Sequence, residues 1–462
     1  MSKRKILLMS DDIRMHSGVA CVSRDIVLGT VHHYDWVQIG GAIDHPESGK
    51  VIDMSEGIKN DFNISNAYVR IYPTSGYGHP DMLRQVIEQE KPDAILHYTD
   101  PRFWLWFYQM EREIRVNIPI FYYNIWDDLP DPVWNELFYR SCDLLMAISK
   151  QTYGINKRML PDYEDWQITY VPHGINETRF FILNPNSADL LDFKQKYTLD
   201  KYDFLILYCN RNIRRKVPGD VVMAYKYFMD QLSKDEQEKC ALVFHTAPVD
   251  DNGTDLRAVC KAMIPEYPVV FTYDVESSEP FDDAKMNYLF NSIDVYINLA
   301  SNEGFGLGSC EALTVEKPIV VNVTGGLQDQ CGFKKENGKY LTAEDYISLG
   351  SLHNRRKWED KIKYGEWVKP IWPSNRSLQG SPVTPFIYDD RCDSEDAGNA
   401  LKEWYDAGVD ERVRCGKLGR QFVKDKIIGM DSEHMADRFI TSMDTVFDRR
   451  IPREPYELEV VK

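Results

Sequence analysis

In one stretch of the chain two glutamates flank three closely spaced glycines, and these residue types at this spacing suit the binding of a phosphorylated ligand. The stretch reads Ser301-Asn302-Glu303-Gly304-Phe305-Gly306-Leu307-Gly308-Ser309-Cys310-Glu311. A strand pattern over 294–299 precedes it, a short helical pattern continues it, and a strand pattern over 318–322 follows. Glycines let backbone approach a ligand closely, and the helix N-terminus directs N–H groups and partial positive charge to the same place. We therefore predict an anion pocket in which Glu303 and Glu311 are available to hydroxyls of the same ligand.

Each feature of this stretch also has a purely structural explanation. A glutamate in the first helical turn, where we expect Glu311, is favourable by about 0.3–1 kcal/mol through the helix dipole alone. Ser309 is an ordinary N-cap candidate, and Glu303 could be a solvated side chain. The chain has no G-x-G-x-x-G after its first strand and no G-x-x-x-x-G-K-[ST]. The phosphate-binding interpretation therefore depends on residues elsewhere in the chain.

The composition describes a globular protein of two or three domains. The chain has 462 residues, of which 43% are hydrophobic and 27% are charged. A net charge of −17 argues against broad binding to nucleic acid or anionic lipid, so an anionic ligand would need a local basic pocket. The nine cysteines form no C-x-x-C pair, which favours a reducing compartment over disulfides or a zinc site. The apolar run over 6–9 is too short for a signal peptide or a membrane span, so we expect a cytoplasmic protein.

The first half of the chain alternates strand and helix patterns. After a first strand, Gly18 stands where the chain turns into a helical pattern over 19–33, a position that suits close ligand approach or a tight turn alone. Such alternation predicts a parallel sheet covered by helices on both faces. The further strands are expected over 34–39, 68–72, 93–98, 118–123, 143–148 and 168–171, and helices over 81–90 and 102–115.

A turn-rich stretch over 184–200 separates this half from a second α/β series. Two such halves imply a ligand crevice at the carboxyl ends of their strands. We interpret the Trp- and Pro-rich, locally basic segment at about 350–385 as an insertion. The strands of the second series are expected over 204–209, 241–245, 269–272, 294–299 and 318–322, and helices over 220–231, 254–262, 283–291, 394–427 and 432–449.

Several of these pieces together resemble one family, the GT-B glycosyltransferases of the GT4 type. The spacing from Glu303 to Glu311 is E-x7-E, in the order found in that family. Four other segments resemble its remaining motifs in the same order along the chain. They are Asp143-Leu144-Leu145-Met146-Ala147-Ile148-Ser149, Val171-Pro172-His173-Gly174-Ile175-Asn176, Asn210-Arg211-Asn212-Ile213-Arg214-Arg215-Lys216 and Thr324-Gly325-Gly326-Leu327.

The resemblance implies a fold and a division into domains. The fold is α/β, with two Rossmann-like, doubly wound parallel-sheet domains that face a cleft. Residues 1–183 would form an N-terminal domain on the acceptor side, and 184–428 a domain that binds a nucleotide sugar and contains the insertion. Residues 429–462 would form a C-terminal helix that packs back on the first domain.

The resemblance also implies a role for individual residues. Arg211 and Lys216 would grip the diphosphate of the donor, and charge-assisted hydrogen bonds of this kind contribute about 1.5–3 kcal/mol each. Glu303 would hold sugar hydroxyls, and Glu311 would accept hydrogen bonds from the ribose. Gly18 would lie against the phosphates from the other domain. The backbone of the glycine loop would complete the donor site through Gly304, Phe305, Gly306 and Leu307.

The sequence departs from the family pattern at a catalytic position. The family often has a histidine after the strand that corresponds to 118–123, whereas this chain has Asn124-Ile125-Trp126-Asp127-Asp128. We expect Asp127, or Asp128 as the weaker candidate, to take the polar role, so that Asp127 and Glu303 are the candidate catalytic residues. His97 and Asp100 are reserve candidates. Ser17-Gly18 also stands where the family usually has Gly-Gly.

The reaction that the resemblance implies is transfer of a sugar from a nucleotide-diphosphate sugar to a hydroxyl of a glycan or glycoconjugate, with retention at the anomeric carbon. Arg211, Lys216 and the helix dipole would take up the charge of the leaving group, so no cofactor and no metal is expected. Nucleic acid is not expected as a partner, peripheral membrane contact is not indicated, and the sequence leaves the oligomeric state open. Two alternatives remain at this point: a nucleotide-sugar epimerase of the same architecture, and a non-catalytic protein that binds sugar nucleotides or glycans.

Overall fold

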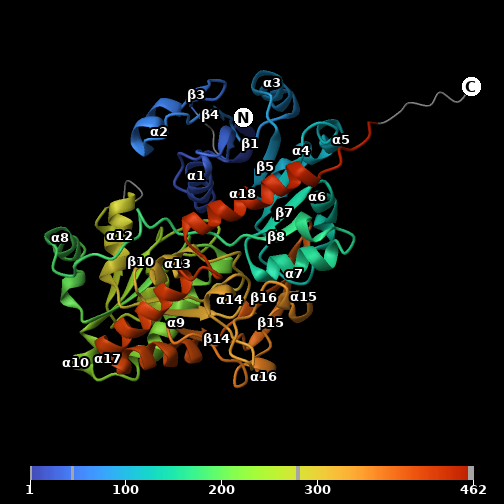
Figure 1. Cartoon of the computed structure of the whole chain (residues 1–462). Helices are drawn as coiled ribbons and strands as arrows, with labels where there is room; N and C mark the ends of the chain where they lie inside the picture. The colour runs from blue at the N-terminus through green and yellow to red at the C-terminus, as the bar shows by residue number, and fades with distance from the viewer. Residues whose placement is uncertain (1–2, 43–45, 277–280, 456–462) are drawn as a thin grey trace, which may run out of the picture. The chain divides into compact units, whose positions relative to one another are not determined.

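The chain forms two compact units, here called unit 1 and unit 2. The structure is a computed structural model that describes residues 3–42, 46–276 and 281–455. Unit 1 comprises residues 1–126, 131–174 and 432–462, and unit 2 comprises 127–130 and 175–431 (Figure 1). These bounds differ from the expected ranges because residues 175–183 pack within unit 2: Ile175 N donates to Met430 O at 2.9 Å, and Phe181 N donates to Asn287 Oδ1 at 3.1 Å. Residues 456–462, the end of the expected third range, lie outside the described residues.

Unit 1 is built on an eight-stranded sheet in the order β3-β4-β2-β1-β5-β6-β7-β8, parallel except for the edge strand β3. In β1, Ile6, Leu7, Leu8 and Met9 are all fully buried, as expected for a strand covered on both faces. The first strand therefore reads as a continuous apolar run. The strands are β1 (Arg4–Asp11), β2 (Tyr34–Gly41), β3 (Ile52–Asp53), β4 (Val69–Pro73), β5 (Ala94–Tyr98), β6 (Ile120–Asn124), β7 (Leu144–Ala147) and β8 (Ile168–Tyr170).

The last helix, α18 (Ser432–Arg449), belongs to unit 1 and packs against α1 (Gly18–Thr30). A Cβ atom placed on Gly29 would lie 3.1 Å from the Cβ atom of Ala436, so the two helices approach closely. Met435, Phe439, Met443 and Val446 are its buried apolar face. The other helices of unit 1 are α2 (Ser55–Phe62), α3 (Pro80–Glu90), η1 (Pro101–Trp104), α4 (Leu105–Gln109), α5 (Glu111–Ile114), η2 (Val133–Asn135), α6 (Glu136–Arg140), α7 (Lys150–Met159) and η3 (Asp165–Gln167).

Unit 2 is built on a six-stranded parallel sheet in the order β11-β10-β9-β12-β13-β14. The chain winds from β9 to β10 and β11 on one side, and then returns to place β12 on the other side of β9. The order therefore reverses between β9 and β12, which is the position where open α/β sheets bind ligands. The strands are β9 (Phe204–Cys209), β10 (Cys240–His245), β11 (Val269–Phe271), β12 (Val295–Asn298), β13 (Ile319–Asn322) and β14 (Val368–Ile371).

Helices cover both faces of this sheet. In Figure 1, α9 (Pro218–Met229) and α17 (Ser394–Val423) lie side by side, and Gly398 of α17 approaches α9 so closely that a Cβ atom there would clash with Tyr227. Gly408, with a φ of 78°, interrupts α17. The remaining helices are α8 (Ala188–Lys196), η4 (Leu199–Lys201), η5 (Arg214–Lys216), α10 (Lys234–Gln237), α11 (Leu256–Met263), η6 (Thr272–Asp274), α12 (Asp283–Ser292), α13 (Leu307–Thr314), α14 (Leu327–Gln330), α15 (Asp345–Leu349) and α16 (Arg355–Trp358).

The segment expected as an insertion at 350–385 is in part a component of the sheet. Strand β14 pairs in parallel with β13, with Ile319 opposite Val368, so it forms the sixth strand of the sheet. After it the chain forms an antiparallel hairpin of β15 (Asn375–Ser381) and β16 (Thr384–Arg391). Strand β14 was not predicted because its apolar core is short and lies between two tryptophans in a strongly charged segment. No helix among the described residues has the length and the apolar composition needed to cross a bilayer.

Candidate functional site

Lys216 and Glu303 form a buried ion pair at the point where the strand order of unit 2 reverses. Lys216 ends η5, which follows β9, and Glu303 lies in the loop after β12. The Lys216 Nζ atom donates to Glu303 Oε2, and the two residues are 8% and 7% exposed. Since β9 and β12 are neighbouring parallel strands, the loops at their carboxyl ends meet. The structure therefore brings together these two sequence-predicted residues.

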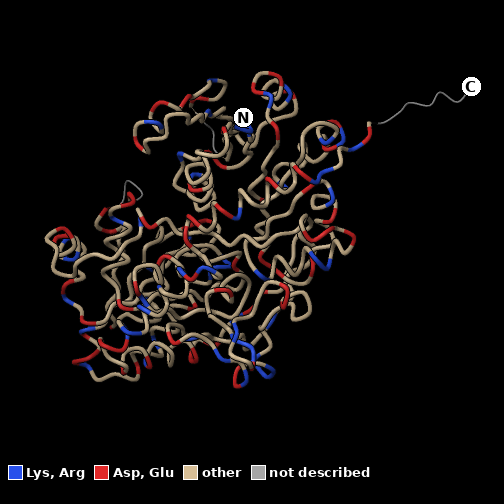
Figure 2. Tube along the Cα trace, in the orientation of Figure 1, with Lys and Arg blue, Asp and Glu red and all other residues tan. Residues whose placement is uncertain are grey.

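The surroundings of Lys216 disfavour its positive charge. Burial lowers the pKa of the Lys216 ammonium well below its usual range, the neighbouring Arg215 lowers the pKa further, and the Asp127 carboxylate opposes this shift. An anion that contacts both Lys216 and Arg215 would favour the protonated lysine and interact with two adjacent cations. Figure 2 shows Lys and Arg interspersed with Asp and Glu along most of the trace, so this positive charge is a local feature of an acidic protein.

Two glycines bring the loop after β13 against the loop that carries Glu303. A Cβ atom on Gly325 would lie 2.0 Å from Glu303 O, and one on Gly326 would lie 2.1 Å from Gly304 O. Gly326 N donates to Glu303 O at 2.8 Å. Only glycine permits this approach, which holds the backbone on either side of Glu303 in place.

The helix after the glycine loop starts earlier than the sequence indicated. Gly306, with a φ of 90°, is the N-cap of α13, so Ser309 lies inside the helix and is not its N-cap. Glu311 consequently lies beyond the first turn rather than in it. Desolvation raises the pKa values of the Tyr296 hydroxyl and the Cys209 thiol, and the charge of Glu311 raises them further; both groups lie at or beside the carboxyl end of β9. Gly304, Phe305 and Leu307 lie between the two glutamates, as the motif requires.

The arginine beside Lys216 is Arg215, and not Arg211. The Arg211 side chain is 64% exposed and its Nε atom lies 2.9 Å from the Asp250 carboxylate. Arg215 donates from Nη1 to Asn302 O at 2.9 Å and lies 3.3 Å from the Asp127 carboxylate. The run of three cations over 214–216 is the sequence feature that indicates Arg215, whereas the spacing of the family motif indicates Arg211.

Asp127 lies in unit 2, in a four-residue segment that unit 2 holds by several contacts. Besides the ion pair of Asp127 with Arg215, Tyr388 N donates to Leu129 O at 2.8 Å. Asp128 is buried, which raises the pKa of its carboxyl group well above the usual range, and the charge of Asp127 raises it further. Asp127 is the more accessible of the two carboxylates, with 21% of its side chain exposed.

The other candidates lie in unit 1. Gly18 is the exposed first residue of α1, after its N-cap Ser17. His97 is fully buried, its Nδ1 atom lies 2.7 Å from the Tyr108 hydroxyl, and burial lowers its pKa to about 3. Asp100 caps η1 and forms an ion pair with Arg102. These contacts give His97 and Asp100 structural roles.

His173 is held by tyrosines of two strands of unit 1. Its Nδ1 atom lies 2.7 Å from the Tyr123 hydroxyl, and its Nε2 atom lies 3.3 Å from the Tyr98 hydroxyl. Burial lowers the pKa of His173 to about 3, so the ring is neutral at pH 7. The ring is therefore a component of the core.

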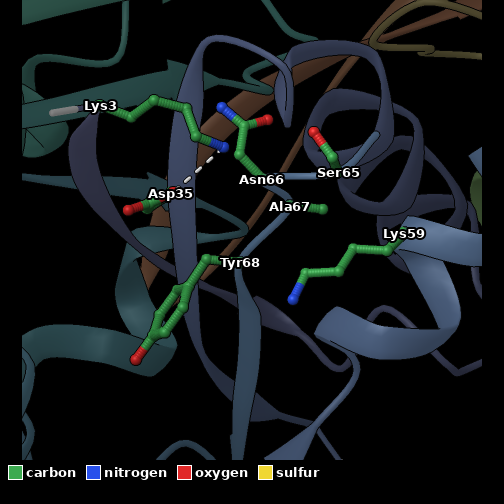
Figure 3. A pocket seen from close by; sticks show the side chains of 7 residues that line it. All are labelled: Lys3, Asp35, Lys59, Ser65, Asn66, Ala67 and Tyr68. Carbon is green, nitrogen blue, oxygen red and sulfur yellow. Dashed lines mark ion pairs between the residues drawn. The ribbon is translucent and has the colours of Figure 1, made fainter. Parts of the chain in front are cut away.

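A surface pocket of about 410 Å³ in unit 1 is at the wrong end of the sheet for a catalytic site (Figure 3). Lys3 precedes β1, Asp35 is near the start of β2, and Tyr68 precedes β4, so the pocket lies at the amino ends of these strands. Lys3 is paired with Asp35 at 3.1 Å. Ligands of open α/β sheets bind at the carboxyl ends. Among the described residues, no three His, Cys, Asp or Glu side chains are grouped to hold a metal ion.

The two parallel-sheet units give the chain the GT-B fold, the fold of a large class of glycosyltransferases. Three solved structures are similar over nearly the whole chain. HepE from Anabaena in complex with UDP and glucose has a TM-score of 0.63 at 12% identity, covering 96% of this chain and 100% of that one. Sucrose-phosphate synthase from Thermosynechococcus elongatus has a TM-score of 0.64 at 14% identity, covering 96% and 100%. The trehalose-6-phosphate protein from E. coli bound with UDP-2-fluoro glucose has a TM-score of 0.62 at 13% identity, covering 97% and 100%.

Similarity in sequence is weaker and partial. The chain is 20% identical over 263 residues to the α-monoglucosyldiacylglycerol synthase of Acholeplasma laidlawii. The match covers 56% of this chain, and the chain spans 59% of the length of that relative. No family model matches the chain.

Proposed function

We propose that the protein is a retaining glycosyltransferase that moves a sugar from a nucleotide-diphosphate sugar to a hydroxyl of a glycan or glycoconjugate. The observation that carries the proposal is the buried Lys216–Glu303 pair at the carboxyl ends of β9 and β12. A cation and a carboxylate that face each other in a protected site suit a ligand with a phosphate at one end and sugar hydroxyls at the other. We propose that Glu311, whose charge acts on Cys209 at the end of β9, accepts hydrogen bonds from the ribose.

In the proposed reaction the bond from the anomeric carbon to the diphosphate oxygen breaks, and a bond to the acceptor oxygen forms on the same face. The acceptor proton passes to an oxygen of the departing diphosphate. Lys216 and Arg215 receive the negative charge that develops on this leaving group, and fixed charges in a buried site need no reorganisation to do so. Glu303 orients the sugar, and Asp127 orients the acceptor hydroxyl. We propose that these cations make a metal ion unnecessary.

The same comparisons support a choice of the donor to test first. HepE is in complex with UDP and glucose, the E. coli protein is bound with UDP-2-fluoro glucose, and the Acholeplasma relative is named for a glucosyl lipid. UDP-glucose is therefore the first donor to test. We place the protein in a reducing compartment, the cytoplasm, because no disulfide joins any of its nine cysteines, all of which lie among the described residues. We propose no nucleic-acid partner because of the net charge of −17.

The proposal is tested by incubating the protein with a panel of nucleotide sugars, with and without glycan and glycolipid acceptors. Nucleoside diphosphate release together with glycosylated acceptor supports a transferase, and a product with the donor's anomeric configuration supports retention. Interconversion of the free nucleotide sugar would indicate an epimerase instead. Binding without turnover would indicate a non-catalytic sugar-nucleotide protein. A chelator in the reaction tests the expectation that no metal is needed.

Asp127→Asn should impair transfer more than donor binding. The substitution removes the charge of the carboxylate that lies 3.3 Å from Arg215, and it leaves the size of the side chain almost unchanged. We expect turnover to fall by at least about tenfold, which corresponds to ~1.4 kcal/mol in the barrier, while affinity for UDP changes by less than about threefold. Steady-state kinetics and calorimetric titration measure the two effects. Asp131→Asn, which removes a carboxylate from the Arg158 ion pair in unit 1, is the matched control. Equal losses of turnover and affinity would make Asp127 a structural residue.

Affinity for UDP should decrease as the pH rises through the range in which the free lysine loses its proton, by up to about tenfold per pH unit. Burial holds the pKa of Lys216 below its usual range, and a bound diphosphate favours the ammonium, so binding takes up a proton. The phosphate itself does not contribute, because its second pKa is on the order of 6. Calorimetry in two buffers with different ionisation heats measures the uptake. Lys216→Arg, whose guanidinium does not titrate in this range, should bind UDP without this pH dependence. An unchanged slope in that variant would assign the proton to another group.

A further inference from the structure

Three consecutive charged residues at the end of the hairpin strand β16 each pair with a different part of unit 2. Asp389 accepts from Arg214 Nη1 at 2.5 Å, Asp390 accepts from Arg376 Nε at 2.6 Å, and Arg391 donates to Asp220 at 2.7 Å. Asp389 and Asp390 are 2% and 3% exposed. Buried carboxylates next to each other repel, so each must have a partner to be tolerated. This arrangement lies beside the proposed donor site and belongs to none of the motifs by which the sequence was interpreted.

Asp389 connects the two loops that carry Lys216 and Glu303. Its Oδ2 atom holds Arg214, the first residue of η5, and its Oδ1 atom accepts from Asn302 Nδ2 at 3.1 Å. Arg214 is two residues before Lys216, and Asn302 is adjacent to Glu303. The same two loops are also joined directly, because Ser301 N donates to Arg215 O at 2.8 Å. One buried carboxylate thus adds a side-chain link between the cationic loop and the acidic loop, beside their backbone hydrogen bond.

The hairpin itself does not depend on the Asp389 side chain for its attachment. Asp390 N donates to Ser301 O at 3.0 Å, and Asn322 Nδ2 donates to Asp390 O at 2.8 Å. The Asp390 carboxylate also accepts from Thr324 Oγ1 at 2.9 Å, in the loop that contains Gly325. With Asp390 and Arg391 holding the strand, the contacts of Asp389 act on the two loops alone.

We propose that Asp389 is a positioning residue for the donor diphosphate: through Arg214 and Asn302 it sets the separation of Lys216 and Glu303. This inference rests on the proposed function, since it assigns Asp389 a part in the same donor site. Asp389 does not contact the reacting atoms. Its negative charge lies beside a site for an anion, so by electrostatics alone it opposes phosphate binding. The charge is tolerated there because Arg214 neutralises it.

Positioning of the loops by Asp389 favours phosphate binding, whereas its negative charge opposes it. Asp389→Asn therefore distinguishes the two effects. The asparagine keeps the size of the side chain and retains an oxygen for Asn302, but it loses the ion pair with Arg214. If Asp389 positions the loops, affinity for UDP and for inorganic pyrophosphate falls by about tenfold and the KM of the donor rises in parallel, while kcat changes less. If Asp389 acts only through its charge, both anions bind more tightly. Unchanged or tighter binding by Asp389→Asn overturns the inference.

A double-mutant cycle shows whether the effect passes through Arg214. We expect Arg214→Gln to weaken UDP binding, and the double variant Asp389→Asn/Arg214→Gln to bind no more weakly than the weaker single variant. Additive losses would overturn the proposed route. Arg412→Gln is the control for loss of stability in unit 2, because Arg412 is buried and pairs with Asp294 at 3.2 Å, at the amino end of the sheet. It should lower the unfolding midpoint and leave UDP affinity unchanged. Wild-type protein that binds neither UDP nor pyrophosphate would contradict the proposed function itself, and this inference with it.

Discussion

Lys216→Met should destabilise unit 2 by about 3–5 kcal/mol and reduce turnover by at least about tenfold. The loss of stability is expected because Glu303 is 7% exposed and would keep its charge without its partner. The loss of turnover is expected because the leaving diphosphate would lose a cation. Glu303→Gln should also lower stability and turnover, since it removes the buried carboxylate that pairs with Lys216 and that we propose orients the sugar. Denaturant unfolding and steady-state kinetics on both variants measure the two effects separately.

The double variant Lys216→Met/Glu303→Gln separates a catalytic pair from a structural one. Removing both charges removes the cost of an unpaired buried ion, and such replacements are often neutral or stabilising. We therefore expect the double variant to unfold at nearly the wild-type denaturant concentration and to remain at least about tenfold slower. Recovery of wild-type turnover together with stability would mean that the pair only holds the loops together. The double variant also keeps the test valid if a single variant fails to fold, since 3–5 kcal/mol is a large part of the usual ~5–15 kcal/mol of stability.

The sheets of both units were predictable because their strands are buried on both faces. A strand such as β9, with Phe204, Leu205, Ile206, Leu207 and Tyr208 in sequence, reads as an apolar run whatever surrounds it. Elements with weaker patterns were predicted less well. The helix expected over 102–115 is divided into η1, α4 and α5, with Asp100 capping the first of them ahead of Pro101. Helix α8 lies within the stretch expected to be turns.

The candidate site was predictable where a residue type is required by the backbone or by burial. Gly326 fits only as glycine, and Lys216 and Glu303 follow neighbouring strands, so motif spacing alone indicated that they meet. The choice between Arg211 and Arg215 was not predictable, because it depends on how η5 turns after β9. The role of Asp389 could not be predicted for the same reason. Asp389 lies more than 80 residues from Glu303 in sequence, and only the hairpin brings this carboxylate to the two loops.

Gly326→Ala is the substitution that tests this packing with the least change in chemistry. Gly326 has a φ of −74°, a value that alanine adopts readily, so backbone strain does not contribute to the effect. The new Cβ atom would lie 2.1 Å from Gly304 O and 2.6 Å from Phe305 Cα, and both contacts are with backbone that cannot rotate away. Overpacking of this kind costs about 1–3 kcal/mol and sometimes more.

The effect on activity should exceed the effect on stability, because the loop that must move is the one that carries Glu303. Relief of the clash lengthens the 2.8 Å hydrogen bond from Gly326 N to Glu303 O and displaces the carboxylate from Lys216. Since a displacement of about 1 Å at a reacting centre can cost roughly 100-fold, we expect kcat/KM for the donor to fall by at least about tenfold in protein that still folds. Gly219→Ala is the matched control: nothing lies within 4 Å of its Cβ position in α9, and alanine there should raise stability by up to about 1 kcal/mol without changing turnover. A Gly326→Ala protein with wild-type kinetics would show that the Glu303 loop is not held by this contact, because the atoms that the methyl group would meet belong to Gly304 and Phe305, the backbone that directly follows Glu303.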